Sequence, residues 1–335
     1  MSSKLLSVVM PIYNVERFLP DSIESVISKK YYDDIEILLI DDGSTDGSKT
    51  VCKSYSIKYN NISYFYKENG GLSDARNFGL RKATAEYVFF FDSDDMLLDH
   101  AIDEIYETLN NNKPQVLIWD AMIIDEENRI LDNSAETYYL HNGLCSNQKY
   151  SGLDFIKYQI NDHNDYVTTV WLGAYNRELL ISNNLFFEKG LLHEDELWTQ
   201  KVLLNTENLI YVDKKWYLYR IRSNSIMNST SKNKERNLSS LIYSYNSLYS
   251  YINWKIDDTD KKTMLLANIT KRYLNSLVHY DVTNYKKLYN QINRQVILKN
   301  SFSIVNVVQS LLLCIDISLF VKIAKIGKRL KGNKR

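Results

Sequence analysis

The chain has 335 residues, of which 44% are hydrophobic and 24% charged, a composition that is typical of a globular protein and excludes a wholly disordered one. Acidic and basic residues number 41 each, so the basic excess of a nucleic-acid-binding protein is absent and no nucleic-acid partner is expected. The three cysteines (Cys52, Cys145 and Cys314) are far apart and odd in number, which favours a reducing compartment over a disulfide framework.

The amino-terminal apolar run, residues 5–12, is interpreted as a strand rather than a signal peptide. It lacks a basic lead-in of the usual length and a small-residue cleavage site, and it ends close to Pro11. No segment of the chain reaches the roughly 18 uninterrupted apolar residues of a membrane-spanning helix. A cytoplasmic location is therefore expected.

The first third of the chain alternates short apolar runs with amphipathic segments. Strands are predicted at residues 6–14, 35–40, 62–66, 87–91 and 116–119. Helices are predicted at residues 18–28, 75–82 and 101–111, and between the second and third strands a helix ends near residue 59. This alternation indicates βαβ units with right-handed crossovers, and hence an α/β fold with a mostly parallel, Rossmann-like sheet.

Acidic residues follow two of these strands. Asp41 and Asp42 end the second strand, and Asp92, Asp94 and Asp95 end the fourth. Because ligands of open α/β sheets bind beyond the carboxyl ends of the strands, these acids are expected to meet in one crevice. Carboxylates this close repel one another unless a cation neutralises them, and they suit Mg²⁺ or Mn²⁺ bridging substrate phosphates. Taken alone, the second group is better explained as a solvated turn that caps the helix starting near residue 101; the rest of the chain favours the ligand site instead.

The region from residue 120 to residue 226 is less regular. Strands are predicted at residues 122–125, 138–140, 209–212 and 216–219, with helices at 153–160 and from residue 194 onward. Arg220, Arg222 and Ser225 lie in a polar loop whose cations and hydroxyls suit a phosphate. Glu194 and Asp195 begin a helix, where acids also serve simply to oppose the helix dipole.

Four segments, in this order and spacing, resemble the motifs of inverting, metal-dependent family 2 glycosyltransferases, which are nucleotide-sugar enzymes with the GT-A fold. The segments are Val8-Val-Met-Pro-Ile-Tyr-Asn14, Ile40-Asp-Asp-Gly-Ser-Thr-Asp46, the pair Gly71-Leu-Ser-Asp-Ala-Arg-Asn-Phe-Gly79 and Asp92-Ser-Asp-Asp95, and His193-Glu-Asp195. The resemblance covers residues 5–226. Its last ten residues, from Tyr217, are similar to the ending of bacterial capsule and exopolysaccharide members.

The resemblance implies a role for each matching residue. Asp42 is the implied contact of the uracil base, Asp94 the metal ligand together with Asp92, and Asp195 the general base beside Glu194. The residues implied to hold the nucleotide-sugar are Pro11, Tyr13, Asp41, Asp42, Asp74, Arg76, Asp92, Ser93, Arg220, Arg222 and Ser225. The implied cofactor is Mn²⁺ or Mg²⁺.

The implied reaction moves one hexose from a nucleotide-sugar, expected to be UDP-linked, to a hydroxyl of a surface-polysaccharide precursor. The expected acceptor is carried on undecaprenyl diphosphate. A single displacement needs one base and inverts the anomeric carbon, unlike the two-acid chemistry of a glycoside hydrolase. No Gln-x-x-Arg-Trp string of processive members occurs, so one transfer per acceptor is predicted.

Two other functions stay open. A catalytically silent nucleotide-sugar-binding module would keep the same residues without turnover. A sugar nucleotidyltransferase should carry a glycine-rich, lysine-bearing loop after the first strand, whereas residues 13–17 contain neither glycine nor lysine.

Three regions are predicted: a GT-A domain over residues 1–228, a helical region over 235–300, and an amphipathic basic tail over 301–335. The tail stripe comprises Val305, Val308, Leu312, Ile315, Leu319, Ile323, Ile326 and Leu330. Seven Lys or Arg residues and no acid follow Asp316, which favours a helix lying on the inner face of the cell membrane. The alternative is packing on its own domain or on a second subunit, so an oligomer is possible.

Overall fold

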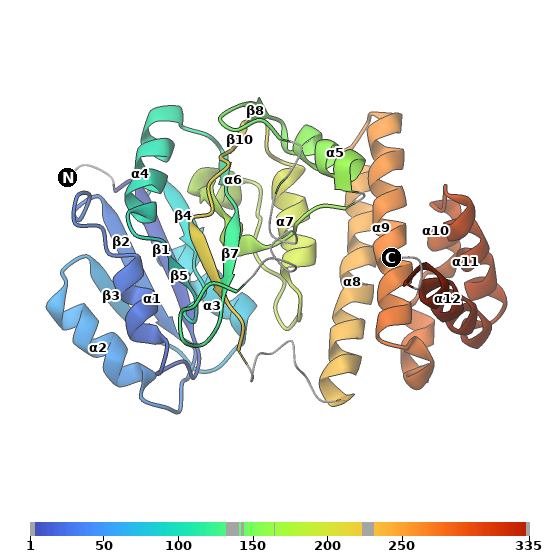
Figure 1. The fold of residues 1–335 in the computed structure, drawn as a ribbon, viewed down its shortest axis with the longest axis horizontal. Coiled ribbons are helices and arrows are strands. Elements are labelled where there is room, and N and C mark those ends of the chain that lie inside the picture. Colours follow the sequence, from blue (N-terminus) through green and yellow to red (C-terminus); the bar gives the residue numbers. More distant parts are fainter. Residues whose placement is uncertain (1–3, 132–140, 142–143, 164, 223–230, 333–335) are drawn as a thin grey trace. The chain divides into compact units, whose positions relative to one another are not determined.

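The computed structural model describes residues 4–131, 141, 144–163, 165–222 and 231–332. The chain forms two compact units (Figure 1). The sheet unit comprises Met1–Gly190 and Trp198–Ser225, and the helical unit comprises Leu191–Leu197 and Ile226–Arg335. The short segment Leu191–Leu197 therefore belongs with the carboxyl-terminal helices, which the sequence did not suggest; the predicted boundary at residue 228 stays a prediction.

The sheet unit contains an eight-stranded sheet in the order β3-β2-β1-β4-β9-β6-β10-β8. Its strands are β1 Leu6–Ile12, β2 Ile35–Asp41, β3 Ile62–Tyr66, β4 Tyr87–Phe90, β6 Val116–Ile118, β8 Lys149–Tyr150, β9 Gly173–Asn176 and β10 Leu209–Tyr211. The predicted mostly parallel sheet is confirmed, since β9 pairs antiparallel with β4 and β6, and β8 antiparallel with β10, while the other neighbouring pairs are parallel.

A second sheet of three strands covers part of one face. It has the order β5-β11-β7, with β5 Met96–Leu97, β7 Ala121–Ile124 and β11 Tyr217–Arg220. β11 runs parallel to β7 and antiparallel to β5. Because β5 follows the Asp92–Asp95 acids directly, this small sheet joins residues near 220 to the end of β4.

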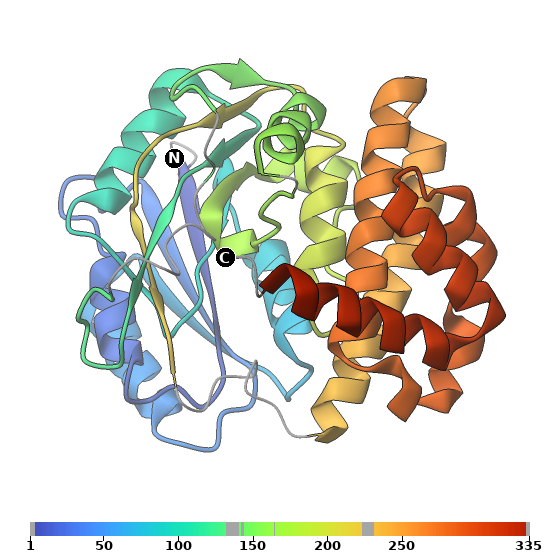
Figure 2. The same cartoon turned by 45° about the vertical axis from the view of Figure 1, so that its right-hand side comes forward.

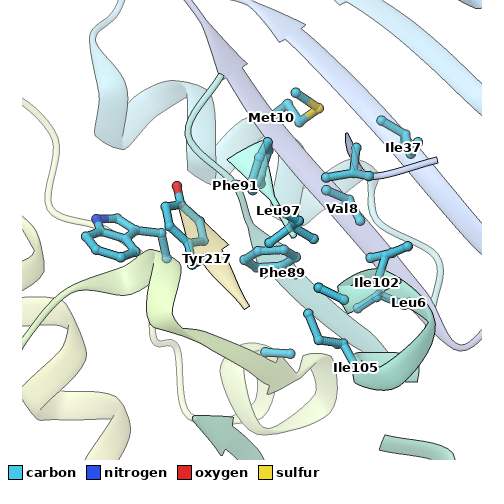
Figure 3. Packing of buried hydrophobic residues seen from close by; sticks show 14 of the residues in the cluster. Leu6, Val8, Met10, Ile37, Phe89, Phe91, Leu97, Ile102, Ile105 and Tyr217 are labelled. Carbon is cyan, nitrogen blue, oxygen red and sulfur yellow. The ribbon is translucent and has the colours of Figure 1, made fainter. Parts of the chain in front are cut away.

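Strand β4 shows how the sheet divides the core. Phe89 and Phe91 point to one face, where they pack against Trp119 and Tyr217. Figure 3 shows this layer, in which Leu6, Val8 and Met10 of β1 line up with Phe89 and Phe91 beside Ile102 and Ile105 of α4 (Ala101–Asn112). Phe90, between the two, points to the opposite face and contacts the rings of Phe187 and Trp198. This period of two is the ordinary alternation of a strand.

The helices of the sheet unit include every predicted one and one more, α6, which the sequence did not suggest. They are α1 Leu19–Ser25, α2 Ser48–Lys58, α3 Leu72–Lys82, α4, α5 Gly152–His163, α6 Arg177–Ser182 and the carboxyl-terminal part of α7 Asp195–Leu203, with a 3₁₀ turn η2 at Val170–Leu172. Helix α3 starts three residues before the predicted residue 75, because Gly71 takes a positive φ of 85° and allows the turn to begin there. The strand predicted at 138–140 lies outside the described residues.

The helical unit is built on an α8–α9 hairpin, seen side by side in Figures 1 and 2. Its elements are α8 Ser231–Lys255, α9 Thr259–His279, η3 Val282–Asn284, η4 Lys286–Gln291, α10 Arg294–Lys299, α11 Ile304–Ile315 and α12 Ile317–Gly332. Large side chains on the facing sides of α8 and α9 are buried, as with Leu248 and Tyr273 at 0% exposure each. Tyr245, Tyr249 and Tyr273 therefore belong to the core of this unit, as residues on amphipathic faces usually do.

The tail is two helices rather than one continuous stripe. Asp316 ends α11 in an extended conformation, and its carboxylate accepts the amide of Leu319 at 2.6 Å, capping α12. An acid that favours a cap over a helix interior explains the break. Among the described residues, no helix is long and apolar enough to cross a membrane.

Candidate active site

Strands β2, β1 and β4 are neighbours and parallel, so their carboxyl ends form one edge. The register pairs Ile12 with Asp41, which brings the start of the Tyr13 loop beside the Asp41–Asp42 acids. Tyr13 is 51% exposed at this edge of the sheet. An open depression beside it is lined by Asn14, Val15, Glu16, Arg17, Phe18 and Asp46.

The two acids after β2 are buried and hold backbone. Asp41 accepts the amide of Ser44 at 2.8 Å and the hydroxyl of Tyr64 at 2.9 Å. Asp42 accepts the amides of Gly70 at 2.9 Å and Gly71 at 2.8 Å through its two oxygens. Both acids thus shape loops of the site, and Asp42 fixes the turn that begins α3.

An ion cluster missed by the sequence reasoning continues from Asp42. Lys67, which follows β3, pairs with Asp42 and, at 2.9 Å, with Asp74 on the first turn of α3. Asp74 also meets Lys189 at 2.5 Å, and the ion pairs with Lys189 and Lys67 lower the pKa of Asp74 below its usual range. The signal available in the sequence was a lysine one residue beyond a strand of the same parallel sheet.

Arg76 connects α3 to the end of β4. Its Nη2 lies 2.7 Å from Asp92 Oδ1, and its guanidinium stands over the ring of Phe187 at 5.5 Å. The Arg76 side chain is only 3% exposed, whereas that of Asp92 is 24% exposed. Ser93, next in the chain, donates to the carbonyl of Pro11 at 2.7 Å and so ties the β4 turn to β1.

Asp94 faces the two arginines of the β11 end. Its Oδ2 lies 2.6 Å from Arg222 Nη2, and both guanidinium groups stand over the ring of Phe18, that of Arg220 at 4.9 Å and that of Arg222 at 5.6 Å. Arg220 is buried and donates from Nε to the Asp94 carbonyl at 2.7 Å. Its Nη2 is buried with no hydrogen-bond partner within the described chain, so one strong donor is left over.

Asp95 is the third acid of the turn, and the sequence reasoning gave it no role of its own. It accepts the hydroxyl of Tyr217 at 2.6 Å and the amide of Arg220 at 2.7 Å, so it fixes β11 to the β4 turn. Burial, followed by the charges of Asp94 and Asp92, raises the pKa of Asp95 well above its usual range. Burial likewise raises the pKa of Asp94, with Arg222 opposing the shift. In this structure Arg76 balances the charge of Asp92, and Arg222 balances that of Asp94.

The donor set fits a Mn²⁺ or Mg²⁺ ion that substrate completes. Asp92 and Asp94 are two hard oxygen ligands one residue apart, and both side chains are partly exposed, at 24% and 21%. No cluster of three or more His, Cys, Asp or Glu suited to a metal occurs among the described residues. One or two carboxylates together with substrate phosphates and water is the usual arrangement for Mg²⁺.

The His193-Glu194-Asp195 motif belongs to the helical unit. Asp195 is the first residue of α7 and accepts the amide of Glu196 at 3.0 Å, while Glu194 is buried. Side chains of α8 and α9, and Tyr280 directly after α9, contact this segment. The contacts are Leu192 N to Ser240 Oγ at 3.1 Å, His193 Nε2 to Tyr280 Oη at 3.3 Å, and Arg272 Nη1 to Glu196 Oε2 at 2.8 Å.

The implied donor-site residues from Pro11 to Arg222 thus gather at one edge of the sheet unit. Asp195 and Glu194 are in the other unit, and Ser225 lies outside the described residues. Sequence order alone predicted the common edge of β1, β2 and β4. It did not show that buried Asp42, Ser93 and Arg220 also hold backbone groups.

The model of the family described as "Glycosyl transferase family 2" matches residues 7–181, more than half of the chain. The chain belongs to glycosyl transferase family 2. The matched range includes β1, β2 and β4 with the acids at their ends. The resemblance inferred from the four motifs is confirmed.

Similar family 2 proteins include the glycosyltransferases GlyG and GlyA of Streptococcus pneumoniae. GlyG is 30% identical over 229 residues, which are 67% of this chain and 73% of GlyG. GlyA is 31% identical over 226 residues, which are 66% of this chain and 31% of GlyA. The minor teichoic acid biosynthesis protein GgaA of Bacillus subtilis is 29% identical over 86% of this chain and 62% of its own length. The chain therefore spans less than a third of some curated relatives.

Among solved structures, residues 1–349 of TarS from S. aureus in complex with UDP-GlcNAc are similar, with a TM-score of 0.66 and 18% identity. The match covers 97% of this chain and 92% of that one. A mannosyltransferase from Pyrobaculum calidifontis in complex with GDP-Man and Mn²⁺ gives a TM-score of 0.53. These likenesses confirm the predicted fold class, a GT-A sheet domain followed by helices.

Proposed function

We propose that this family 2 protein transfers one hexose from a UDP-linked sugar to a hydroxyl of a surface-glycan precursor. The observation that supports it best is the edge itself, where exposed Tyr13, the Asp92–Asp94 pair and two arginines converge. An aromatic ring suits a nucleobase, and carboxylates with arginines suit a metal-bound diphosphate. TarS with UDP-GlcNAc has the same fold, which favours a uridine donor.

In this proposal the donor is held by Pro11, Tyr13 and Asp41–Asp42 at the base and by Arg76, Arg222 and Ser225 at the diphosphate. Asp94, assisted by Asp92, holds Mn²⁺ or Mg²⁺, which when bound neutralises charge on the leaving diphosphate. The buried Arg220 Nη2, without a partner within the described chain, offers a further donor to the same charge. Asp74 and Ser93 support the loops around it.

Asp195 is proposed as the general base, with Glu194 as its neighbour. A carboxylate within hydrogen-bond reach of the acceptor hydroxyl removes its proton as the hydroxyl attacks the anomeric carbon. The bond to the diphosphate breaks on the opposite side, so the product is inverted. One base suffices, and no second carboxylate is needed as nucleophile.

The first experiment measures nucleoside diphosphate release from a panel of nucleotide-sugars, with and without Mn²⁺. Asp94→Asn is expected to abolish the metal-dependent release, because the metal loses a charged ligand. Exposed Asp99→Asn is the matched control and should leave release unchanged. Neither binding nor release of any nucleotide-sugar by the unaltered protein would refute the proposal.

A second comparison isolates the base. Asp195→Asn should bind the donor normally but transfer sugar about 10²- to 10⁴-fold more slowly, the usual share of a general base. Asp260→Asn, an exposed acid in the first turn of α9, is the control. Equal transfer by both variants would remove Asp195 from the mechanism.

The acceptor is proposed to be lipid-linked, on undecaprenyl diphosphate, and to receive a single sugar per reaction. The similarity to GgaA, a minor teichoic acid biosynthesis protein, and to capsule-type sequence motifs supports a surface-glycan acceptor. This acceptor would bring the protein to the cytoplasmic face of a membrane. Repeated addition by the purified protein would contradict the single transfer.

A further inference from the structure

Helices α11 and α12 expose an apolar face. Twelve Val, Leu and Ile side chains are exposed in the described part of the chain, and eight of them lie on these two helices. They are Ile304, Val305, Val308, Leu311, Ile315, Leu319, Ile323 and Ile326. Scattered single apolar side chains are ordinary on a protein surface, but a concentration on adjoining helices marks an interaction site.

The opposite faces of the same helices are docked. Leu313 of α11 is buried, as are Phe320 and Val321 of α12, at 0%, 0% and 3% exposure. Both helices contact α9. Lys325 of α12 pairs with Asp281 at 2.6 Å. The helices are therefore fixed to their unit by one face, and the exposed face is a stable feature of the surface.

The charge of α12 indicates what covers this face. From Ile317 to the last residue the chain has seven Lys or Arg and no acid, although the whole chain is neutral. Exposed Lys322 lies three positions after Leu319, so the two are neighbours on the helix surface. Apolar side chains bordered by cations are complementary to acyl chains beneath anionic headgroups.

We propose that the exposed face of α11 and α12, with Lys322 beside it, binds the surface of a membrane rich in anionic lipid. A second copy of this chain fits less well, because a self-complementary interface through α12 would bring together two copies of a helix that carries five Lys or Arg residues and no acid. This inference deepens the proposed function by naming the surface that brings the protein to a lipid-linked acceptor.

The test is flotation of the full-length protein with vesicles of phosphatidylcholine alone or with phosphatidylglycerol added. Binding is expected only with the anionic vesicles. It should weaken as salt rises from about 0.1 M to about 0.5 M, because the headgroup attraction is screened. Nucleoside diphosphate release from the donor is measured on the same samples.

Variants paired with controls separate the apolar from the electrostatic contribution to vesicle binding. Leu319→Ser with Ile323→Ser should lower the vesicle partition coefficient at least about tenfold, whereas Ile57→Ser, at an 83% exposed site on α2, should not. Lys322→Glu should lower it at least about fivefold, and exposed Lys53→Glu on α2 is its control. Donor turnover should be unchanged in all four proteins.

Three results would overturn the inference. The first is that the protein does not bind vesicles, and the second is that the tail variants bind vesicles as well as the unaltered protein. The third is that the protein does not bind vesicles but forms an oligomer, which the tail variants dissociate. The last would assign the face to a second copy. Because donor turnover is measured separately, failure of vesicle binding with intact turnover would leave the proposed function standing.

Discussion

Single residues in this protein often serve structure and chemistry together. Asp42 is implied as a base contact, yet both its oxygens accept amides of the Gly70–Gly71 turn. Asp95 carries no implied role, yet it anchors Tyr217 and the Arg220 amide. A carboxylate that accepts several amide or hydroxyl hydrogen bonds is held in one orientation. The neighbouring residues of the site are thereby kept in fixed positions.

A single residue, His193, is expected to make the folding stability depend on pH. Burial lowers the pKa of His193, and nearby His279 lowers it further, while Glu196 and Glu194 oppose the shift. Between its lowered folded pKa and the unfolded value of about 6.5, the unfolded chain binds more protons, so folding stability falls as pH drops below about 6.5. His193→Asn should remove that part of the loss.

The measurement is thermal unfolding at about pH 7.5 and about pH 5.5. Asparagine suits the positive φ of 56° at this position. His100→Asn is the control, because His100 is exposed and has a φ of 64°. If both variants lose as much stability on acidification as the unaltered chain, the buried imidazole is not the cause.

At the scale of elements, close packing of α3 on the sheet positions Asp74 and Arg76. A methyl group added at Gly79 would meet Val9 Cγ1 at 2.2 Å and Ile40 Cγ1 at 3.3 Å. The helix can lie this near the strands because position 79 has no side chain. Sequence periodicity predicted the helix but not this separation.

Gly79→Ala should therefore destabilise the fold by about 1–3 kcal/mol through overpacking, although alanine favours a helix. Gly327→Ala in α12, where nothing lies within 4 Å, should instead stabilise by about 0.5–1 kcal/mol. Urea unfolding of the two variants measures the difference. A stabilised Gly79→Ala variant would show that the helix moves without cost.

The contact of α9 with α7 yields a second prediction at this scale. Arg272 on α9 holds Glu196, next to the proposed base. Arg272→Met should lower kcat for sugar transfer at least about tenfold with little change in donor KM, since a misplaced base slows only the chemical step.

Arg272→Lys should restore part of the kcat lost in Arg272→Met. Lys287→Met, which removes an exposed ion pair with Glu235, is the control and should leave kcat unchanged. A purely structural role for Arg272 would show instead as a lower melting temperature with kcat unchanged per folded molecule.

At the scale of the whole molecule, the net charge is zero but the charges are unevenly distributed along the chain. With the seven cations after Asp316 set aside, 34 basic residues face 41 acidic ones in the rest of the chain. Opposite potentials at the two ends of a sequence steer association with charged surfaces, and salt screens the effect.

We expect the protein to be retained on a sulfonate column at pH 7 and low salt despite its zero net charge. A version ending at Asp316 should pass through, and Lys322→Glu should elute earlier than Lys53→Glu. Equal elution of the two lysine variants would mean that the tail does not dominate the interaction.

The sequence by itself determined the family, the alternation of strands and helices in the first third of the chain, and the edge where the acids meet. Apolar runs that end in acids reveal buried strands, and parallel connectivity aligns their ends, so Asp41 and Asp92 could be assigned to one edge. Only the tertiary structure decided which side chains pair across elements. Lys67 with Asp42, Asp95 with Tyr217 and Arg272 with Glu196 are distant in sequence, and no local pattern encodes such contacts.

The tertiary structure also decided that the Leu191–Leu197 segment joins the helical unit and that the tail breaks at Asp316. The first depends on long-range packing of α8 and α9. The break at Asp316 depends on whether this residue caps a new helix or continues the preceding one. The two differ by only about 1 kcal/mol, and hydrophobic periodicity alone does not reveal such a difference.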